Sequence, residues 1–273
     1  MLIFFQMASF NSFPVNLDIN NNHMLIQKNN NYKVKADKED WRDYIYMSSQ
    51  NPLKERVDLR PWCSRVEDQG HLGSCTGQSV AGAYELLLNK EQPEKFVDLS
   101  RLYVYYNARL IEGDTSEDEG AYLRDAVKAV HQYGVCSESI WPYNINHFAM
   151  RPTVESYEDG KNRNIRNYYR LLNVNDTVDA LTNDLPVMFS FRVYSAFDNL
   201  EFTKNYILDM PGKTEQPIGG HAMVFVGYDL EKRLFLARNS FGESWCMRGY
   251  CWIPFQYVTD EVMDSWVFDI DLK

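Results

Sequence analysis

Four side chains from three separate segments have the types needed to cleave an acyl bond, and the first of them is Cys75. A helix predicted to begin at residue 74 or 75 would place this thiol at the helix amino terminus. The partial positive charge at that end favours a thiolate, which is the reactive form of cysteine. Gly73 would let a substrate backbone come close to the sulfur. These features predict a nucleophile at Cys75.

The other three side chains can supply an acid–base group and an oxyanion site. His221 follows two glycines at the start of an apolar run, and its imidazole can exchange a proton with the thiol and the leaving amine. The side-chain oxygen of Asn239 can hold the second ring nitrogen without adding charge. Gln69 and the backbone N–H of Cys75 can donate to an oxyanion. Phe241 can cover the His–Asn hydrogen bond and exclude water.

The elements that must position these residues change in character along the chain. Helical periodicity follows residue 74 and recurs over about 100–110 and 120–133, where Gly134 ends the last helix. After Pro186 the pattern predicts short strands at 187–191, 222–226, 233–237, 250–253 and 266–270. Helices first and strands later indicate an α+β chain of two lobes, and clefts form where lobes meet.

The first 56 residues differ from the rest and are expected to form an amino-terminal arm. They contain asparagine-rich stretches at 20–22 and 29–31 and a charged run at 33–42. We expect weak secondary structure there, with one short helix around 38–46. Residues 57–273 are expected to form the folded domain, with a helical lobe at about 57–165 and a β lobe at about 166–273.

Composition excludes several function classes. The 273 residues include 28 basic and 38 acidic side chains, a net charge of −10, so we expect no nucleic-acid partner. The apolar runs are far shorter than the roughly 20 residues that span a bilayer, so we expect no membrane segment. No cysteine or histidine cluster has zinc-ligand spacing, and we expect neither a metal nor an organic cofactor. We further expect a monomer.

The five cysteines do not have the pattern of a secreted disulfide framework, because their number is odd and their spacing irregular. This favours a reducing intracellular compartment, which would be the host cytoplasm or the virion if the source is viral. Cysteines outside the nucleophile position are expected to be inert and apolar; they are Cys63, Cys136, Cys246 and Cys251. A link between Cys246 and Cys251 stays open.

The three segments resemble the active-site motifs of the papain-like cysteine peptidases. Those motifs read Gln-Gly-x-x-Gly-Ser-Cys, x-His-Ala-x-x-x-Gly-Tyr and Asn-Ser-Trp-Gly-x-x-Trp-Gly. Their counterparts here lie at 69–75, at 220–228 with one residue more between Ala222 and Gly227, and at 239–246. The resemblance covers about residues 57–270. It is strongest to a subgroup of bacteria and large DNA viruses, because 57–61 reads Val-Asp-Leu-Arg-Pro and 73–76 reads Gly-Ser-Cys-Thr. It implies a papain-like fold with a helical lobe, an antiparallel β-barrel-like lobe and the active-site cleft between them.

The resemblance also implies an activity and residue roles. It makes Cys75 the nucleophile, His221 the acid–base, Asn239 the residue that orients it and Gln69 the oxyanion donor. The expected function is that of a cysteine endopeptidase that hydrolyses polypeptides through a thioester. Two alternatives stay open: a catalytically silent binding module of the same fold, and an amidase or acyl transferase that uses the same pair of residues.

Substrate contacts and regulation are implied as well. The implied substrate-binding residues are Gly73, Gly120, Ala222, Phe241 and Trp245. Gly120 matches the glycine that binds substrate backbone, and nearby Asp118 and Glu119 suggest a preference for basic residues. Leaders in the family often cross the cleft backward and block it, so residues 1–56 are either such an inhibitor or a plain structural arm.

Four positions depart from the family pattern, and one of them is Thr76, which replaces the aromatic residue after the nucleophile. Leu72 replaces a cysteine that forms a disulfide in the family, which agrees with a reducing compartment. Phe241 replaces the tryptophan that shields the Asn–His pair. Cys246 replaces a glycine, and we expect it to crowd one side of the cleft without affecting proton transfer.

Overall fold

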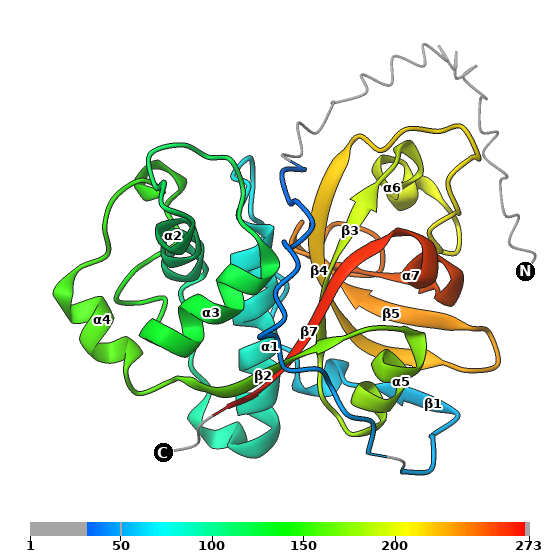
Figure 1. Cartoon of the computed structure of the whole chain (residues 1–273), viewed down its shortest axis with the longest axis horizontal. Helices are drawn as coiled ribbons and strands as arrows, with labels where there is room; N and C mark the ends of the chain where they lie inside the picture. The colour runs from blue at the N-terminus through cyan, green and yellow to red at the C-terminus, as the bar shows by residue number, and fades with distance from the viewer. Residues whose placement is uncertain (1–31, 50, 271–273) are drawn as a thin grey trace, which may run out of the picture.

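The computed structural model describes residues 32–49 and 51–270, which form two lobes side by side (Figure 1). The asparagine-rich stretches at 20–22 and 29–31 lie outside these residues. The helical lobe contains α1 (Cys75–Glu91), α2 (Arg101–Glu112), α3 (Leu123–Tyr133) and α4 (Val154–Gly160). The predicted order, helices first and strands later, is confirmed.

The second lobe is built on an antiparallel sheet with the strand order β2-β7-β3-β4-β5-β6, and β1 pairs with β4. The strands are β1 (Arg56–Asp58), β2 (Ile165–Leu171), β3 (Val187–Val193), β4 (Gly219–Asp229), β5 (Leu234–Arg238), β6 (Tyr250–Pro254) and β7 (Val262–Ile270). Helices α5 (Val174–Thr182), α6 (Ser195–Asp198) and α7 (Phe255–Glu261) pack around it (Figure 1). No pairing joins β6 to β2 among the described residues, so the barrel-like lobe is an open sheet.

Four short 3₁₀ turns complete the described elements, at Arg60–Trp62, Pro93–Lys95, Ile145–His147 and Leu200–Phe202. The helix predicted from residue 120 begins three residues later, at Leu123. Gly120 has φ +75°, and Tyr122 is extended with ψ 141°, so neither has helical geometry. The helix ends at Gly134 as predicted, because that glycine adopts φ +71°.

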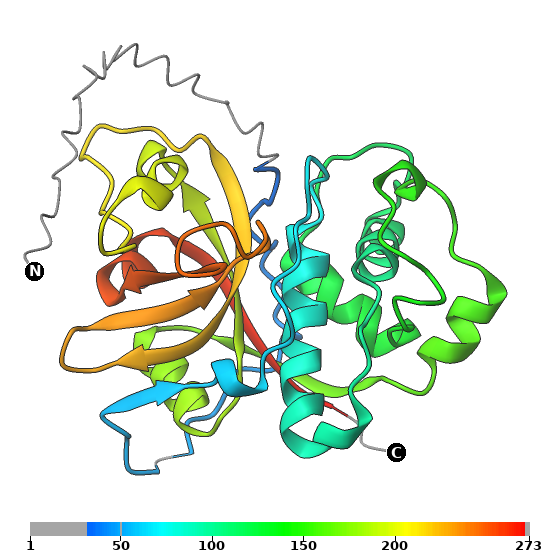
Figure 2. The ribbon, with the colours of Figure 1, turned by 180° about the vertical axis from the view of Figure 1, so that it is seen from behind.

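Helix α1 is buried from Cys75 to Leu88 because it is the helix of its lobe that faces the β lobe, with α2 packed on one side and β4 on another (Figure 2). Gly77 permits this packing. A Cβ at this position would lie 2.7 Å from the carbonyl oxygen of Arg101, at the start of α2. Ser100 caps α2 by accepting a hydrogen bond from the Tyr103 N–H. The nucleophile position is therefore at one end of the most enclosed helix.

The core of the β lobe contains a row of packed phenylalanine rings. The rings of Phe189 on β3 and Phe225 on β4 stack with centroids 3.6 Å apart. The ring centroids of Phe225 and Phe235 lie 4.7 Å apart, and those of Phe235 and Phe255 lie 4.2 Å apart. This core fixes β4, the strand that carries His221, from its inner face.

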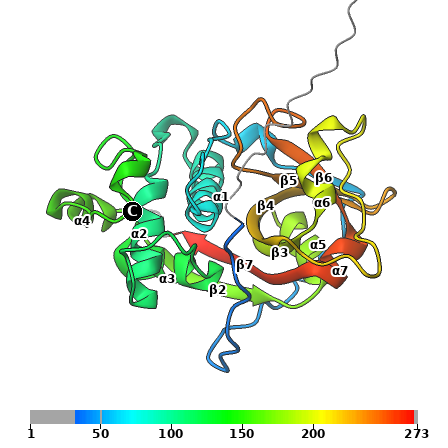
Figure 3. The same ribbon diagram turned by 90° about the horizontal axis from the view of Figure 1, so that it is seen from above.

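The arm, residues 32–49, runs between the lobes in extended form (Figures 1 and 3). The short helix expected around 38–46 is wrong. Its backbone groups bond to β2 instead: Tyr46 N–H donates to the Arg170 carbonyl at 2.8 Å, and Arg170 N–H donates to the Tyr44 carbonyl at 2.8 Å. Pairing with the edge of the sheet thus replaces the local helical hydrogen bonds.

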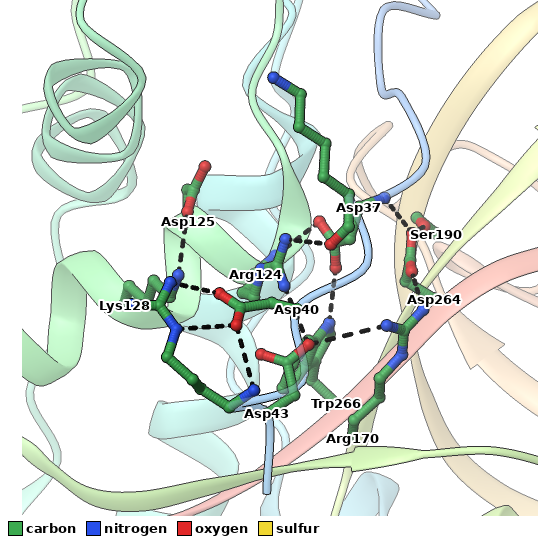
Figure 4. Close-up of polar contacts among 12 residues, drawn as sticks. Asp37, Asp40, Asp43, Arg124, Asp125, Lys128, Arg170, Ser190, Asp264 and Trp266 are labelled. Carbon is green, nitrogen blue, oxygen red and sulfur yellow. Dashed lines mark hydrogen bonds and ion pairs between the residues drawn. The ribbon is translucent and has the colours of Figure 1, made fainter.

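A buried polar cluster ties the arm to both lobes (Figure 4). Asp37 lies at its centre. The Asp37 N–H donates to Asp264 Oδ2 on β7 at 2.7 Å, and its carboxylate accepts from Trp266 Nε1 at 2.9 Å and from the backbone N–H of Arg124 on α3 at 3.2 Å.

Two guanidinium groups complete this cluster. Arg124 pairs with Asp43 at 2.9 Å, and Arg170 pairs with Asp264 at 2.8 Å (Figure 4). Arg170 also lies 3.7 Å from Asp43. The second part of the arm is therefore joined to α3, β2 and β7 together.

Candidate active site

Cys75 is the first residue of α1, and its side chain is fully buried. Burial raises the pKa of the Cys75 thiol to about 12, and Asp118 adds to this. The backbone N–H groups of Ala222, Thr76 and Cys75 itself oppose the rise. The helix terminus acts in the predicted direction, but exclusion of water outweighs it.

His221 lies on β4 and is also fully buried. Its Nε2 lies 2.8 Å from Asn239 Oδ1, while its Nδ1 makes no hydrogen bond among the described residues. Burial lowers the pKa of His221 to about 4, against the opposing effect of the Asn239 hydrogen bond. Burial thus favours the uncharged form of each group, the thiol of Cys75 and the neutral imidazole of His221.

Asn239 follows β5, and its amide is fixed by the next residue. Asn239 Oδ1 accepts the Ser240 N–H at 2.8 Å as well as facing the imidazole. Ser240 in turn donates its hydroxyl to Gln69 Oε1 at 2.5 Å, and its carbonyl accepts the Gln69 N–H at 2.9 Å. Ser240 therefore connects the Asn–His pair to the glutamine loop.

Gln69 is buried in the loop before α1. Its Nε2 donates to the Leu72 carbonyl at 2.9 Å. The Tyr143 hydroxyl donates to the Gln69 carbonyl at 2.9 Å and lies 2.5 Å from the Ser74 hydroxyl. Tyr143 thus joins the glutamine to the residue before Cys75, and no local feature of the sequence identifies it.

Aromatic rings surround the imidazole. Phe241 stacks on His221 with centroids 5.0 Å apart and 28° between the planes. Trp245 contacts Phe241 edge-on at 5.9 Å. Phe197 on α6 lies 5.7 Å from the imidazole and was not anticipated from the sequence. These rings keep water from the Asn239–His221 hydrogen bond.

The remaining expected substrate-binding residues lie near Cys75. A Cβ built on Gly73 would be 3.5 Å from the Gly120 Cα, so the two glycines face each other. Ala222 is buried beside the Cys75 thiol, since its N–H acts on the pKa of that thiol. The structure therefore brings residues from α1, β4 and three loops to one place.

Residues 32–34 of the arm cover the site around Cys75 and His221. The Tyr32 ring packs edge-on against the His221 imidazole at 5.7 Å. Its carbonyl accepts the Gly220 N–H at 3.2 Å, and the Val34 N–H donates to the Gly220 carbonyl at 3.1 Å. Lys33 lies against Gly120 on the opposite side. The arm thus passes between β4 and the helical lobe, directly over the imidazole.

The described residues contain no cluster of three or more histidine, cysteine, aspartate or glutamate side chains arranged to hold a metal ion. All five cysteines are free, so the link left open between Cys246 and Cys251 is not formed. Cys246 has φ +42°, a conformation that suits the glycine it replaces. Among the described helices, none has the length and apolar character to cross a bilayer.

Residues 53–263 match the model of a family described as papain family cysteine protease. An uncharacterized peptidase C1-like protein of Acanthamoeba polyphaga mimivirus is 36% identical over 226 residues, which cover 79% of this chain and 72% of that protein.

Solved structures agree with this match. The cysteine protease xylellain from Xylella fastidiosa superimposes with a TM-score of 0.80 at 33% identity, over 89% of this chain and 97% of that one. The fold is also shared with procathepsin L 3 of Tenebrio molitor, with a TM-score of 0.66 at 24% identity over 87% and 76% of the two chains. The expected papain-like two-lobe fold is confirmed, and the chain belongs to the papain family of cysteine proteases.

Proposed function

We propose that Cys75 and His221 are the catalytic pair of a cysteine endopeptidase, supported by Asn239 and Gln69. The observation that carries this assignment is the 2.8 Å contact between His221 Nε2 and Asn239 Oδ1. It occupies one ring nitrogen and leaves Nδ1 for the thiol. Family membership favours peptide hydrolysis over the silent binding module and over the amidase or transferase.

In the proposed reaction the thiol proton passes to His221, and the Cys75 thiolate attacks the peptide carbonyl carbon. The oxyanion is stabilised by the Cys75 N–H and by the Gln69 amide hydrogen that Leu72 does not accept. His221 then protonates the leaving amine, which departs as a thioester forms. Water, activated by His221, hydrolyses the thioester and releases the acid, restoring the thiol.

The test of this assignment is peptide turnover combined with mass-spectrometric mapping of iodoacetamide labelling. Turnover of peptide substrates is expected, with labelling of Cys75 that a competing peptide substrate slows. Labelling of Cys63 or Cys246, which are partly exposed, is expected to be insensitive to that peptide. Absence of peptide turnover together with cleavage of a small amide or isopeptide would replace the peptidase by the amidase or transferase.

We also propose that residues 32–36 inhibit the enzyme while they are docked. Tyr32 packs on the imidazole, and the buried Val34 bonds to Gly220, so a substrate cannot lie along the same edge of β4. Burial is the largest cause of both pKa shifts, upward for Cys75 and downward for His221. Withdrawal of the arm would admit water and favour the thiolate–imidazolium pair.

Val34→Asp is expected to raise both turnover and the rate of Cys75 alkylation several-fold, because a carboxylate in place of a buried valine weakens docking of the arm. The measurement compares peptide turnover of full-length variant and wild type. Ala36→Asp introduces the same side chain at an exposed position and serves as the matched control. Equal turnover in all three proteins would make the arm a structural element rather than an inhibitor.

Asn239→Ala is expected to lower kcat by about 10- to 100-fold without abolishing it, because the thiol and oxyanion donors remain while the imidazole loses its fixed orientation. Steady-state kinetics across pH would detect the change. Ser244→Ala, a substitution in the same loop but away from the imidazole contacts, should keep the wild-type rate. An unchanged kcat in Asn239→Ala would remove Asn239 from the mechanism.

A further inference from the structure

A carboxylate beside the catalytic residues holds a lysine from the protein's own arm. Lys33 Nζ lies 3.7 Å from Asp118 Oδ2 and also donates to the Asp118 backbone carbonyl. The side chains of Lys33 and Asp118 are 30% and 18% exposed, so the pair is mostly withdrawn from water. Solvent screens such a pair less than it screens an ion pair on the open surface.

The Asp118 carboxylate is fixed relative to the nucleophile. The Gly73 N–H donates to its two oxygens at 3.1 and 3.2 Å, and the Tyr105 hydroxyl on α2 donates to Oδ1. Gly73 lies two residues before Cys75. A charge held in this way can bind a cation without first being ordered, which favours selectivity.

A peptide backbone already lies against Gly120, two residues after Asp118. A Cβ at Gly120 would be 2.8 Å from both the Cβ and the carbonyl oxygen of Lys33, so only glycine admits this approach. The arm therefore shows that an extended chain fits here with a lysine directed to Asp118.

We propose that Asp118 is a specificity-determining residue that favours lysine or arginine at the substrate position lying against Gly120. The inference rests on the proposed peptidase function. When the arm withdraws, the place of the Lys33 ammonium becomes open to a substrate cation. The nearby Arg109 guanidinium is held by backbone carbonyls, those of Thr115, Glu117 and Phe148.

The test uses the full-length protein and pairs of peptides that differ only in lysine against acetyl-lysine, with that residue moved position by position along the peptide. The ratio of kcat/KM values within a pair is the readout. The fraction of enzyme with an undocked arm is the same for both peptides and cancels. The wild type should favour lysine about three- to tenfold at one position.

Asp118→Asn should bring that ratio close to one at the same position, since the amide keeps a hydrogen-bond acceptor but loses the charge. Glu117→Gln removes the same charge from an exposed side chain of the same loop and should keep the wild-type ratio. This control matters because a net charge of −10 would favour lysine at every position.

A uniform ratio at all positions in the wild type, or a preference that Asp118→Asn leaves intact, would overturn the inference while leaving the peptidase assignment in place. If Asp118→Asn fails to fold, the test depends on the wild type alone. Its preference for lysine should occur at one peptide position and should be lost at high salt. Failure of Val34→Asp, in which docking of the arm is weakened, to cleave any peptide would instead refute the proposed function, and this inference with it.

Discussion

Cys75→Ala is expected to lower kcat/KM for peptide cleavage by about 10,000-fold or more while the protein stays folded. The thioester cannot form without the sulfur, and binding plus the oxyanion donors accelerate only a direct attack by water. The lost sulfur leaves a small cavity at the start of α1, where the side chain is fully buried. The expected cost is about 1 kcal/mol of unfolding free energy.

Cys136→Ala is the matched control for this variant. Cys136 is also a free and fully buried thiol, but it follows α3 in the helical lobe, where its carbonyl accepts the Ser100 N–H at 2.9 Å. We expect a similar loss of stability and an unchanged kcat/KM. Turnover and chemical denaturation of both variants separate the two effects. Retained turnover in Cys75→Ala would refute thiol catalysis. An equal loss of turnover in Cys136→Ala would show that the loss in Cys75→Ala comes from impaired folding.

Local sequence signals predict the elements well where the signal and the structural cause coincide. The cap at Ser100, the terminating Gly134 and the apolar strands β3 to β6 are such cases. Strand β2 was not predicted, because it is rich in arginine, asparagine and tyrosine. It forms a strand by pairing with β7, about a hundred residues further along the chain, and only its end residues Ile165 and Leu171 are buried.

The failed helix at 38–46 has a physical cause that only the folded chain reveals. One acidic residue of this segment, and another just before it, pair with groups far away in sequence. Asp43 pairs with Arg124, and the preceding Asp37 bonds to Trp266. Those contacts outweigh the weak local preference of a charged run for helix. Tertiary structure decides the conformation of the arm.

The candidate site likewise has residues that the sequence predicts and contacts that only the structure shows. The motifs identify Cys75, His221, Asn239 and Gln69 from residue type and spacing, and the structure adds the links that hold them. Tyr143 and Tyr32 make contacts that no periodicity or motif indicates, because their partners are 74 and 189 positions away. The boundary at residue 57 stays a prediction, although Tyr46 and Asp37 already pack on both lobes.

The polar cluster around Asp37 has a charge imbalance that should make stability depend on pH. Three carboxylates, those of Asp37, Asp43 and Asp264, share two guanidiniums, those of Arg124 and Arg170 (Figure 4). Burial, and then the charge of Asp264, raises the pKa of Asp37 to about 7 from its ordinary value of 3.8. Burial also raises the pKa of Asp264.

The sign follows from proton linkage. A carboxyl group whose pKa is higher in the folded than in the unfolded state binds its proton more tightly when folded. The stability that this provides is complete below pH 3.8 and is lost as pH rises toward 7. Above that pH the folded protein carries an unbalanced negative charge beside the arm. Docking of the arm should therefore weaken toward neutral pH, since Asp37 belongs to it.

Relative to wild type, the unfolding free energy of Asp37→Asn is expected to rise by about 2–4 kcal/mol between pH 4 and pH 8, because the variant has no carboxylate to ionise. Trp266 Nε1 and the Arg124 N–H donate to different oxygens of Asp37, and the amide can accept only one of them, so the variant also loses about 1–2 kcal/mol at every pH. Urea denaturation of full-length wild type and variant, repeated between pH 4 and 8, measures the difference. The difference between the unfolding free energies of the two proteins cancels the contribution of every titrating group that is not coupled to Asp37.

Asp40→Asn is the control, because Asp40 lies on the same arm but pairs with the exposed Arg42, which holds the pKa of that carboxyl well below its usual range. Its variant should show no gain in stability as pH rises. A deficit in the stability of Asp37→Asn relative to wild type that grows from pH 4 to pH 8 would mean that Arg124 and Trp266 hold residue 37 as an anion. In that case the arm would be released by acid rather than by approach to neutral pH.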